Sequence, residues 1–150
     1  MTLTLTVGTN TYISLADAET YMEGRYEPSG AWAAASNATK NTLLVTATAS
    51  IDRMTWLGEK SVSTQALEFP RDGYTTADTE YTLVENACVE QALWMLTQGN
   101  NPRSAMQAQG VRSVSVGGVS ESWAAGGTPP LCTAAREFLR AWYVRCGVLV

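Results

Sequence analysis

The sequence contains no histidine among its 150 residues, and this absence removes several common kinds of catalytic site. Without imidazole the chain cannot build a Ser-His-Asp triad, a Cys-His pair or a histidine metal site. Cysteine is scarce, with only Cys88, Cys132 and Cys146, and no two of them form a C-x-x-C pair. Such a set argues against a disulfide framework and a zinc site, so we expect buried free thiols. We therefore predict that the protein is not an enzyme and uses no cofactor or metal.

Long apolar runs are also missing. No stretch approaches the roughly 18 apolar residues that a membrane-spanning helix needs. Residues 1–7 carry no basic side chain and no apolar core segment, so they are not expected to act as a signal peptide. These absences predict synthesis in a reducing cytoplasm and no membrane partner.

Charged residues make up only 16% of the chain, against 45% hydrophobic residues, which suits one folded domain with a real core. The net charge is -4, so we expect the chain as a whole to bind nucleic acid poorly, because such binding needs basic side chains that neutralise phosphates. The charge is uneven: residues 1–90 hold 12 acids and 5 bases, whereas residues 91–150 hold 2 acids and 5 bases. This gradient suits contacts between copies or docking on an acidic partner, or it is ordinary surface scatter.

Hydrophobic spacing predicts four helices, over about residues 15–25, 37–54, 80–98 and 129–147. Alternation of Thr with Leu or Val predicts a short strand at residues 2–7, and two β-prone runs around Gly117-Gly118 predict a hairpin over residues 111–123. In the long segment 57–79 we expect Phe69 to plug the core and Arg71 to be more open. The predicted fold class is mainly α: a four-helix domain over residues 1–150 with a small β-hairpin and a short N-terminal strand.

Four segments, taken in order, resemble a known group of phage proteins. They are Thr11-Tyr-Ile-Ser-Leu-Ala-Asp-Ala-Glu-Thr-Tyr21, Gln65-Ala-Leu-Glu-Phe-Pro-Arg71, the hairpin Val111–Trp123, and Leu139-Arg-Ala-Trp-Tyr143. The order and spacing resemble the head–tail adaptor, or connector, proteins of tailed bacteriophages, a group that overlaps the sequences labelled putative DnaT-like single-stranded-DNA-binding proteins.

The adaptor resemblance implies a structural virion protein in the phage neck, made in the host cytoplasm. Such proteins form a ring, usually of twelve copies, that docks on the portal and bridges it to a tail-side neck, stopper or tail-tube protein. Genomic DNA would pass through the channel without sequence-specific binding. The alternative is a single-stranded-DNA-binding, DnaT-like replication accessory protein, which would combine basic residues with stacking aromatic side chains.

The resemblance places portal docking on the last helix, where arginines and aromatic residues are typical of binding hot spots. The candidate docking residues are Arg136, Arg140, Trp142, Tyr143 and Arg145. Trp142 also lies on the packed stripe of that helix, so a place in the core is the other interpretation. Contacts with a neighbouring subunit or a tail-side protein would come from Arg112, Val114, Val116, Gly117, Gly118, Trp123 and Arg71. Alternatively, the hairpin lies on its own domain.

Overall fold

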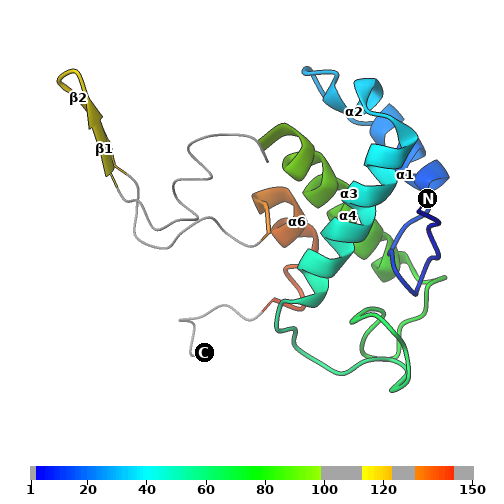
Figure 1. The fold of residues 1–150 in the computed structure, drawn as a ribbon. Coiled ribbons are helices and arrows are strands. Elements are labelled where there is room, and N and C mark those ends of the chain that lie inside the picture. Colours follow the sequence, from blue (N-terminus) through cyan, green and yellow to red (C-terminus); the bar gives the residue numbers. More distant parts are fainter. Residues whose placement is uncertain (1–2, 99–112, 123–130, 144–150) are drawn as a thin grey trace.

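The computed structural model describes residues 3–98, 113–122 and 131–143, which are coloured in Figure 1. Within these ranges the protein is mainly helical and has one two-stranded antiparallel sheet, so the predicted fold class is confirmed. The helices are α1 (Leu15–Glu23), α2 (Ala31–Ala34), α3 (Asn37–Asp52), α4 (Thr79–Gln98) and α6 (Thr133–Phe138), and the strands are β1 (Ser113–Val116) and β2 (Val119–Ser122). No helix in this part of the chain is both long enough and apolar enough to cross a membrane.

Serine caps start two of the helices where the sequence predicts. The Ser14 hydroxyl accepts a hydrogen bond from the Asp17 backbone N–H at 3.1 Å, and α1 begins at the next residue. Ser36 does the same for Thr39 at 3.2 Å and starts α3. Each cap satisfies a backbone donor that the first helical turn leaves open.

Helix α4 is the centre of the fold and packs against α1, α2, α3 and α6. Tyr81, Val84, Cys88 and Ala92 recur at helical spacing within the predicted helix 80–98, and all four are buried. The buried surface extends well beyond these four residues, because neighbours cover α4 on several sides. It adds Ala87, Val89, Glu90, Gln91 and Leu93.

The predicted N-terminal strand does not form within residues 3–7. The chain instead turns at Gly8, which has a φ of 80°, an angle that glycine adopts readily and other residues rarely adopt. Val7 makes only an isolated bridge with Thr11. The Asn10 side chain accepts from the Thr6 backbone N–H at 2.8 Å and so occupies a donor that a neighbouring strand would need. The prediction of a strand is therefore wrong for residues 3–7, where the described fold offers no partner strand.

Aromatic rings close the core beside the long segment that precedes α4. Phe69 is 2% exposed, and its ring meets those of Trp56 and Trp142 edge to face, each with centroids 5.2 Å apart. Tyr12 adds a third edge contact at 6.0 Å. The prediction that Phe69 plugs the core is confirmed.

The last helix is shorter than predicted. It begins after Cys132, and after Phe138 the chain turns so that the Trp142 carbonyl accepts from the Leu57 backbone N–H at 2.8 Å. That bond to the preceding loop takes the place of further helical hydrogen bonding, which is why the helix stops early. Its inward residues Leu131, Ala135 and Leu139 are buried as the spacing predicts, whereas Cys146 lies outside the described residues.

Candidate functional site

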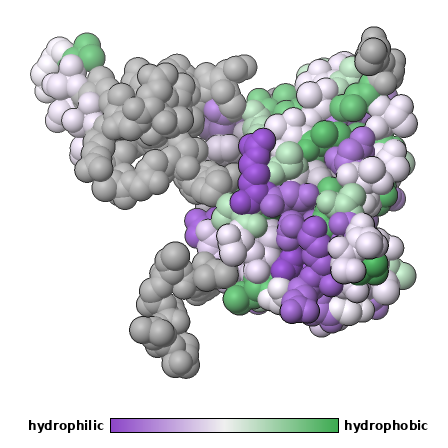
Figure 2. Space-filling model, turned by 60° about the horizontal axis from the view of Figure 1, so that its bottom comes forward, coloured by the Kyte–Doolittle hydropathy of each residue, from purple (hydrophilic) through white to green (hydrophobic). Residues whose placement is uncertain are grey.

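Four of the five bases in residues 1–90 are used in ion pairs inside the helical body. Each pairs with a glutamate, which largely cancels its charge at the surface. Figure 2 shows strongly hydrophilic residues gathered in a band across this body. The pairs are Arg25–Glu90, Lys40–Glu19 at 2.7 Å, Lys60–Glu68 at 3.3 Å and Arg71–Glu68 at 2.7 Å.

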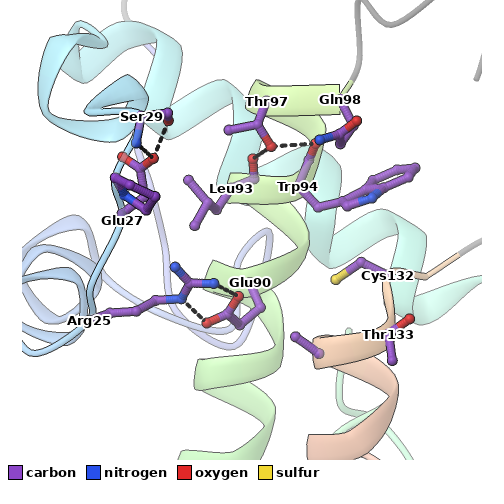
Figure 3. Close-up of a pocket in the computed structure, with 12 residues that line it drawn as sticks. Arg25, Glu27, Ser29, Glu90, Leu93, Trp94, Thr97, Gln98, Cys132 and Thr133 are labelled. Atoms are coloured by element: carbon purple, nitrogen blue, oxygen red, sulfur yellow. Dashed lines mark hydrogen bonds and ion pairs between the residues drawn. The ribbon is translucent and has the colours of Figure 1, made fainter.

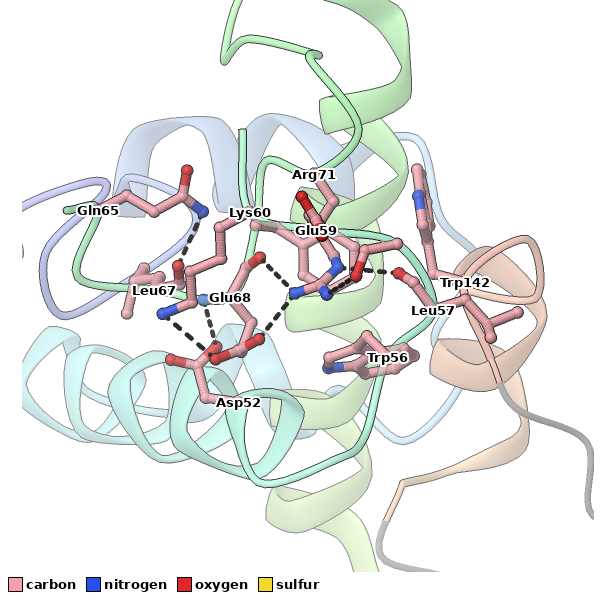
Figure 4. Close-up of polar contacts among 12 residues, drawn as sticks. Asp52, Trp56, Leu57, Glu59, Lys60, Gln65, Leu67, Glu68, Arg71 and Trp142 are labelled. Carbon is pink, nitrogen blue, oxygen red and sulfur yellow. Dashed lines mark hydrogen bonds and ion pairs between the residues drawn. The ribbon is translucent and has the colours of Figure 1, made fainter. Parts of the chain in front are cut away.

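Arg71 illustrates this internal use of charge, and the expectation that it is open is wrong. It is only 6% exposed, and its Nε donates to the Leu57 carbonyl at 2.9 Å. Its Nη1 donates to both the carbonyl and the carboxylate of Glu68, at 3.2 and 2.7 Å. Figure 4 shows the guanidinium enclosed by the loop, so Arg71 closes the segment between α3 and α4 and offers no surface to a partner.

Arg136 in α6 and Arg140 in the turn after it differ, because both are exposed and neither forms an ion pair with another described residue. The Arg136 guanidinium lies over the Tyr143 ring, 5.1 Å from its centroid. Arg140 follows one turn later. The structure thus brings three of the predicted interface residues, Arg136, Arg140 and Tyr143, to one accessible end of the chain, whereas Arg145 lies outside the described residues.

Trp142 belongs to the core and is not a surface anchor. It is 6% exposed, its ring packs on Phe69, and its indole N–H donates to the Asp72 carboxylate at 3.2 Å. The packed stripe on the last helix was therefore the correct indication for this residue.

The hairpin forms as predicted, with Val116 paired to Val119 across the Gly117-Gly118 turn. Both glycines have left-handed φ angles, 60° and 84°, which this tight turn requires. The hairpin stands clear of the helices in Figure 1, and a hydrophobic patch marks its end in Figure 2. The two valines are 73% and 74% exposed. Arg112 and Trp123 lie outside the described residues, as does the side chain of Val114.

A hollow of about 450 Å³ crosses α4 near its C-terminal end, between the segment after α1 and the start of α6. We call it the Trp94 hollow, and Figure 3 shows its lining. Trp94 lies on the side of α4 that faces Cys132 and Thr133, and Arg25 reaches the other side to bind Glu90. Trp94 is half-buried, so part of its indole stays accessible.

A second hollow of about 570 Å³ adjoins it along the same helix pair. We call it the Phe138 hollow. It is lined mainly by apolar side chains, with Arg140 and Glu137 as its charged members. Ala134 lines both hollows, so the two meet at that residue. The lining residues are Leu83, Ala134, Glu137, Phe138, Arg140 and Ala141.

The described thiols show no sign of reactivity. Burial raises the pKa of Cys88 to about 12, and burial also raises the pKa of Cys132, so both are protonated at neutral pH. Within the described ranges no group of three or more Cys, Asp and Glu side chains is placed to hold a metal ion.

One family model covers nearly the whole chain. Residues 2–148 match the model described as putative DnaT-like ssDNA binding protein. The chain therefore belongs to this DnaT-like family. No curated protein and no solved structure matches the sequence.

The family match corrects the interpretation of the sequence as a head–tail adaptor. It supports the alternative, a DnaT-like single-stranded-DNA-binding protein, and nothing supports the portal, the tail-side neck, stopper or tail-tube protein, or the twelve-copy ring. The view that DNA only passes through a channel is wrong for the same reason. The adaptor interpretation rested on the four resembling segments, and the net charge of -4 was taken to fit it. That net charge averages the internally paired basic residues of residues 1–90 with Arg136 and Arg140, which form no ion pair with another described residue.

Sequence reasoning missed the two hollows, although part of the signal was present. Trp94 and Phe138 are aromatic residues in the basic third of the chain, which holds 5 bases and 2 acids. The spacing of Phe138 on the helix stripe indicated an inward residue, and it is in fact half-buried. Nothing in the sequence shows that each ring lines a hollow that Ala134 also lines.

Proposed function

We propose that this protein binds single-stranded DNA, as an accessory to a process such as replication that exposes single strands. The observation that carries the proposal is the family match over residues 2–148. The binding surface that we propose includes α6 and the residues that follow it to Tyr143.

The distribution of usable charge supports this surface. Proteins that bind single strands combine basic side chains, which contact the phosphates, with aromatic side chains, which stack on the nucleobases. Arg136 and Arg140 are exposed without an ion pair to a described residue, and Tyr143 lies against Arg136. The remaining body carries an excess of acids, which repels the phosphate backbone and so favours binding on this one face.

Few basic side chains are unpaired among the described residues, so we expect modest affinity that falls as salt rises. Each neutralised phosphate of a single strand contributes a slope of about −0.7 in the logarithm of the binding constant against that of salt. Duplex DNA of the same sequence is expected to bind more weakly, because its bases are stacked within the helix and cannot pack against aromatic side chains.

Fluorescence anisotropy with a labelled single strand tests the proposal, with the matching duplex as competitor. The double variant Arg136→Ala/Arg140→Ala should weaken binding at low salt by about tenfold or more, because two phosphate contacts are lost. Two Lys→Ala changes at ion-paired positions, Lys40 and Lys60, alter the net charge equally and should have a smaller effect. A wild-type protein that binds neither form at low salt would refute the proposal.

We also propose that the bound strand is not cut or modified, which extends the expectation drawn from the absence of histidine. The location in the virion neck, expected from the adaptor resemblance, has no support apart from that resemblance and stays a prediction.

A further inference from the structure

We infer that the unpaired strand lies along the seam between α4 and α6, with one base in the Trp94 hollow and the next in the Phe138 hollow. This inference rests on the proposed single-strand binding and names the site. It depends on the two hollows, their half-buried aromatic rings and the charges around them.

Both hollows are large enough to hold a nucleobase, and they share one lining residue. Their volumes, about 450 and 570 Å³, fall within the range of about 300–1,000 Å³ found for small-molecule sites. Both are lined by Ala134, whose side chain is small. In the arrangement that we infer, the strand runs over Ala134 from one hollow to the other.

Each hollow has one aromatic side chain that is packed on the core yet only partly buried. These are Trp94 from α4 and Phe138 from α6. A ring held from behind by the core and open in front is a rigid surface for stacking, and it loses little side-chain entropy when a base binds. Stacking of this kind tolerates any base, as expected for binding without sequence preference.

Arg25 supplies hydrogen-bond donors at the Trp94 hollow. Its Nε and Nη2 bind the Glu90 carboxylate, and its Nη1 donates to the Tyr26 carbonyl at 3.2 Å. An arginine has five N–H donors, so one remains on each terminal nitrogen without a partner among the described residues. Glu90 fixes the guanidinium in place, and the two spare donors can reach an oxygen or ring nitrogen of a bound base.

The charges at the Phe138 hollow indicate where the phosphate backbone of the bound strand lies. Arg140 lines the hollow and Arg136 lies nearby on α6, so phosphates are attracted along the exposed side of this helix. Glu137 lies between these two arginines in sequence, is exposed, and forms no ion pair with a described residue. Its carboxylate repels the phosphates of a bound strand. Removing this charge should therefore tighten binding, which tests the inference.

The first experiment uses the unaltered protein and an oligothymidylate in which single positions carry 5-iodouracil. The oligonucleotide should exceed the site sizes of about 4–16 nucleotides common for one domain. Ultraviolet cross-linking and mass spectrometry then locate the attached residues. We expect attachment at Trp94 and Phe138, whereas attachment only outside the seam overturns the inference even though single-strand binding stands.

Substitutions provide the second experiment, with anisotropy as the measurement and circular dichroism to confirm folding. Trp94→Ala and Phe138→Ala should each weaken binding about tenfold, and Trp94→Phe should retain most of the affinity because stacking is preserved. Glu137→Gln should tighten binding several-fold at low salt, and Glu59→Gln, an exposed acid in the loop before α4, serves as its matched control.

The outcomes separate the two proposals. If the wild type binds no single strand, the proposed function fails and the site falls with it. If the wild type binds but folded Trp94→Ala and Phe138→Ala variants bind equally well, the strand lies elsewhere and only the seam is refuted. Weaker binding by both, with tighter binding by Glu137→Gln, supports the seam.

Discussion

The Arg25 guanidinium binds both carboxylate oxygens of Glu90, which joins the segment just after α1 to the middle of α4 across 65 positions of sequence. The Nη2–Oε2 distance is 2.9 Å, and the Tyr21 hydroxyl donates to the same carboxylate at 2.7 Å. The Glu90 side chain is only 7% exposed, so its charge depends on these partners. The contact fixes one wall of the Trp94 hollow and also holds α1 against α4.

Replacing Arg25 should therefore destabilise the fold. Loss of one partner of a buried pair costs about 3–5 kcal/mol, and because Arg25 is one-third exposed we expect about 1–3 kcal/mol for Arg25→Ala. Urea unfolding measures the change. The double variant Arg25→Met/Glu90→Met should lose less than Arg25→Ala, because no unpaired buried carboxylate remains. An Arg25→Ala protein as stable as wild type would show that the pair has no structural role.

Phe69 should be among the most sensitive positions in the core. Its ring is 2% exposed and contacts the rings of Tyr12, Trp56 and Trp142. Phe69→Ala leaves a cavity among them and should cost about 3–5 kcal/mol in the free energy of unfolding. Tyr26→Ala, at a side chain 87% exposed, should stay within about 0.5 kcal/mol and is the control. Equal losses at the two positions would contradict the placement of Phe69.

Arg71→Lys tests whether the segment before α4 is held by the hydrogen-bond geometry of the guanidinium or only by its positive charge. The guanidinium donates to the Leu57 carbonyl, the Glu68 carbonyl and the Oε2 of the Glu68 carboxylate, an arrangement that a single ammonium cannot reproduce. We expect a loss of about 1–3 kcal/mol, because buried carbonyls lose their donor. Differential scanning calorimetry records it as a lower Tm. Wild-type stability in the lysine variant would mean that charge alone suffices.

Glu85 should make the stability of the fold depend on pH. Burial, with a smaller contribution from Asp17, raises the pKa of Glu85 above its ordinary value of 4.5. The folded state thus favours the protonated carboxyl, and this stability is present below pH 4.5 and is lost as pH rises through the raised pKa. Glu85→Gln lacks this loss, so its stability relative to wild type should increase from pH 4 to pH 7. A difference that stays constant over that range would contradict the assignment.

The sequence predicted those parts of the fold that depend on local periodicity and capping. Ser14 and Ser36 cap their helices, and Val84 and Cys88 lie on the buried stripe of α4, because these features act within one or two turns. The prediction of a strand at residues 2–7 was wrong, because a strand needs a partner strand. Whether a partner is present depends on distant parts of the chain.

The candidate site was less predictable because it depends on which charges meet after folding. Arg71 and Arg140 look alike in sequence, yet Arg71 is buried against Glu68 and Arg140 is exposed in the turn after α6. The half-buried state of Trp94 likewise depends on the start of α6, which lies far along the chain. The net charge indicated a protein that does not bind nucleic acid. That conclusion was wrong, because ion pairing within the fold determines which charged side chains remain available to a ligand.

Salt dependence of single-strand binding tests the central claim most directly. We expect the wild-type protein to bind an oligothymidylate at low salt, with a logarithmic slope of about −1.4 to −3, equivalent to two to four phosphates. The Arg136→Ala/Arg140→Ala variant should have a slope shallower by about 1.4, because two of those contacts are gone. No binding at low salt, or an affinity that does not change with salt, would contradict the claim that this protein holds single-stranded DNA through Arg136 and Arg140.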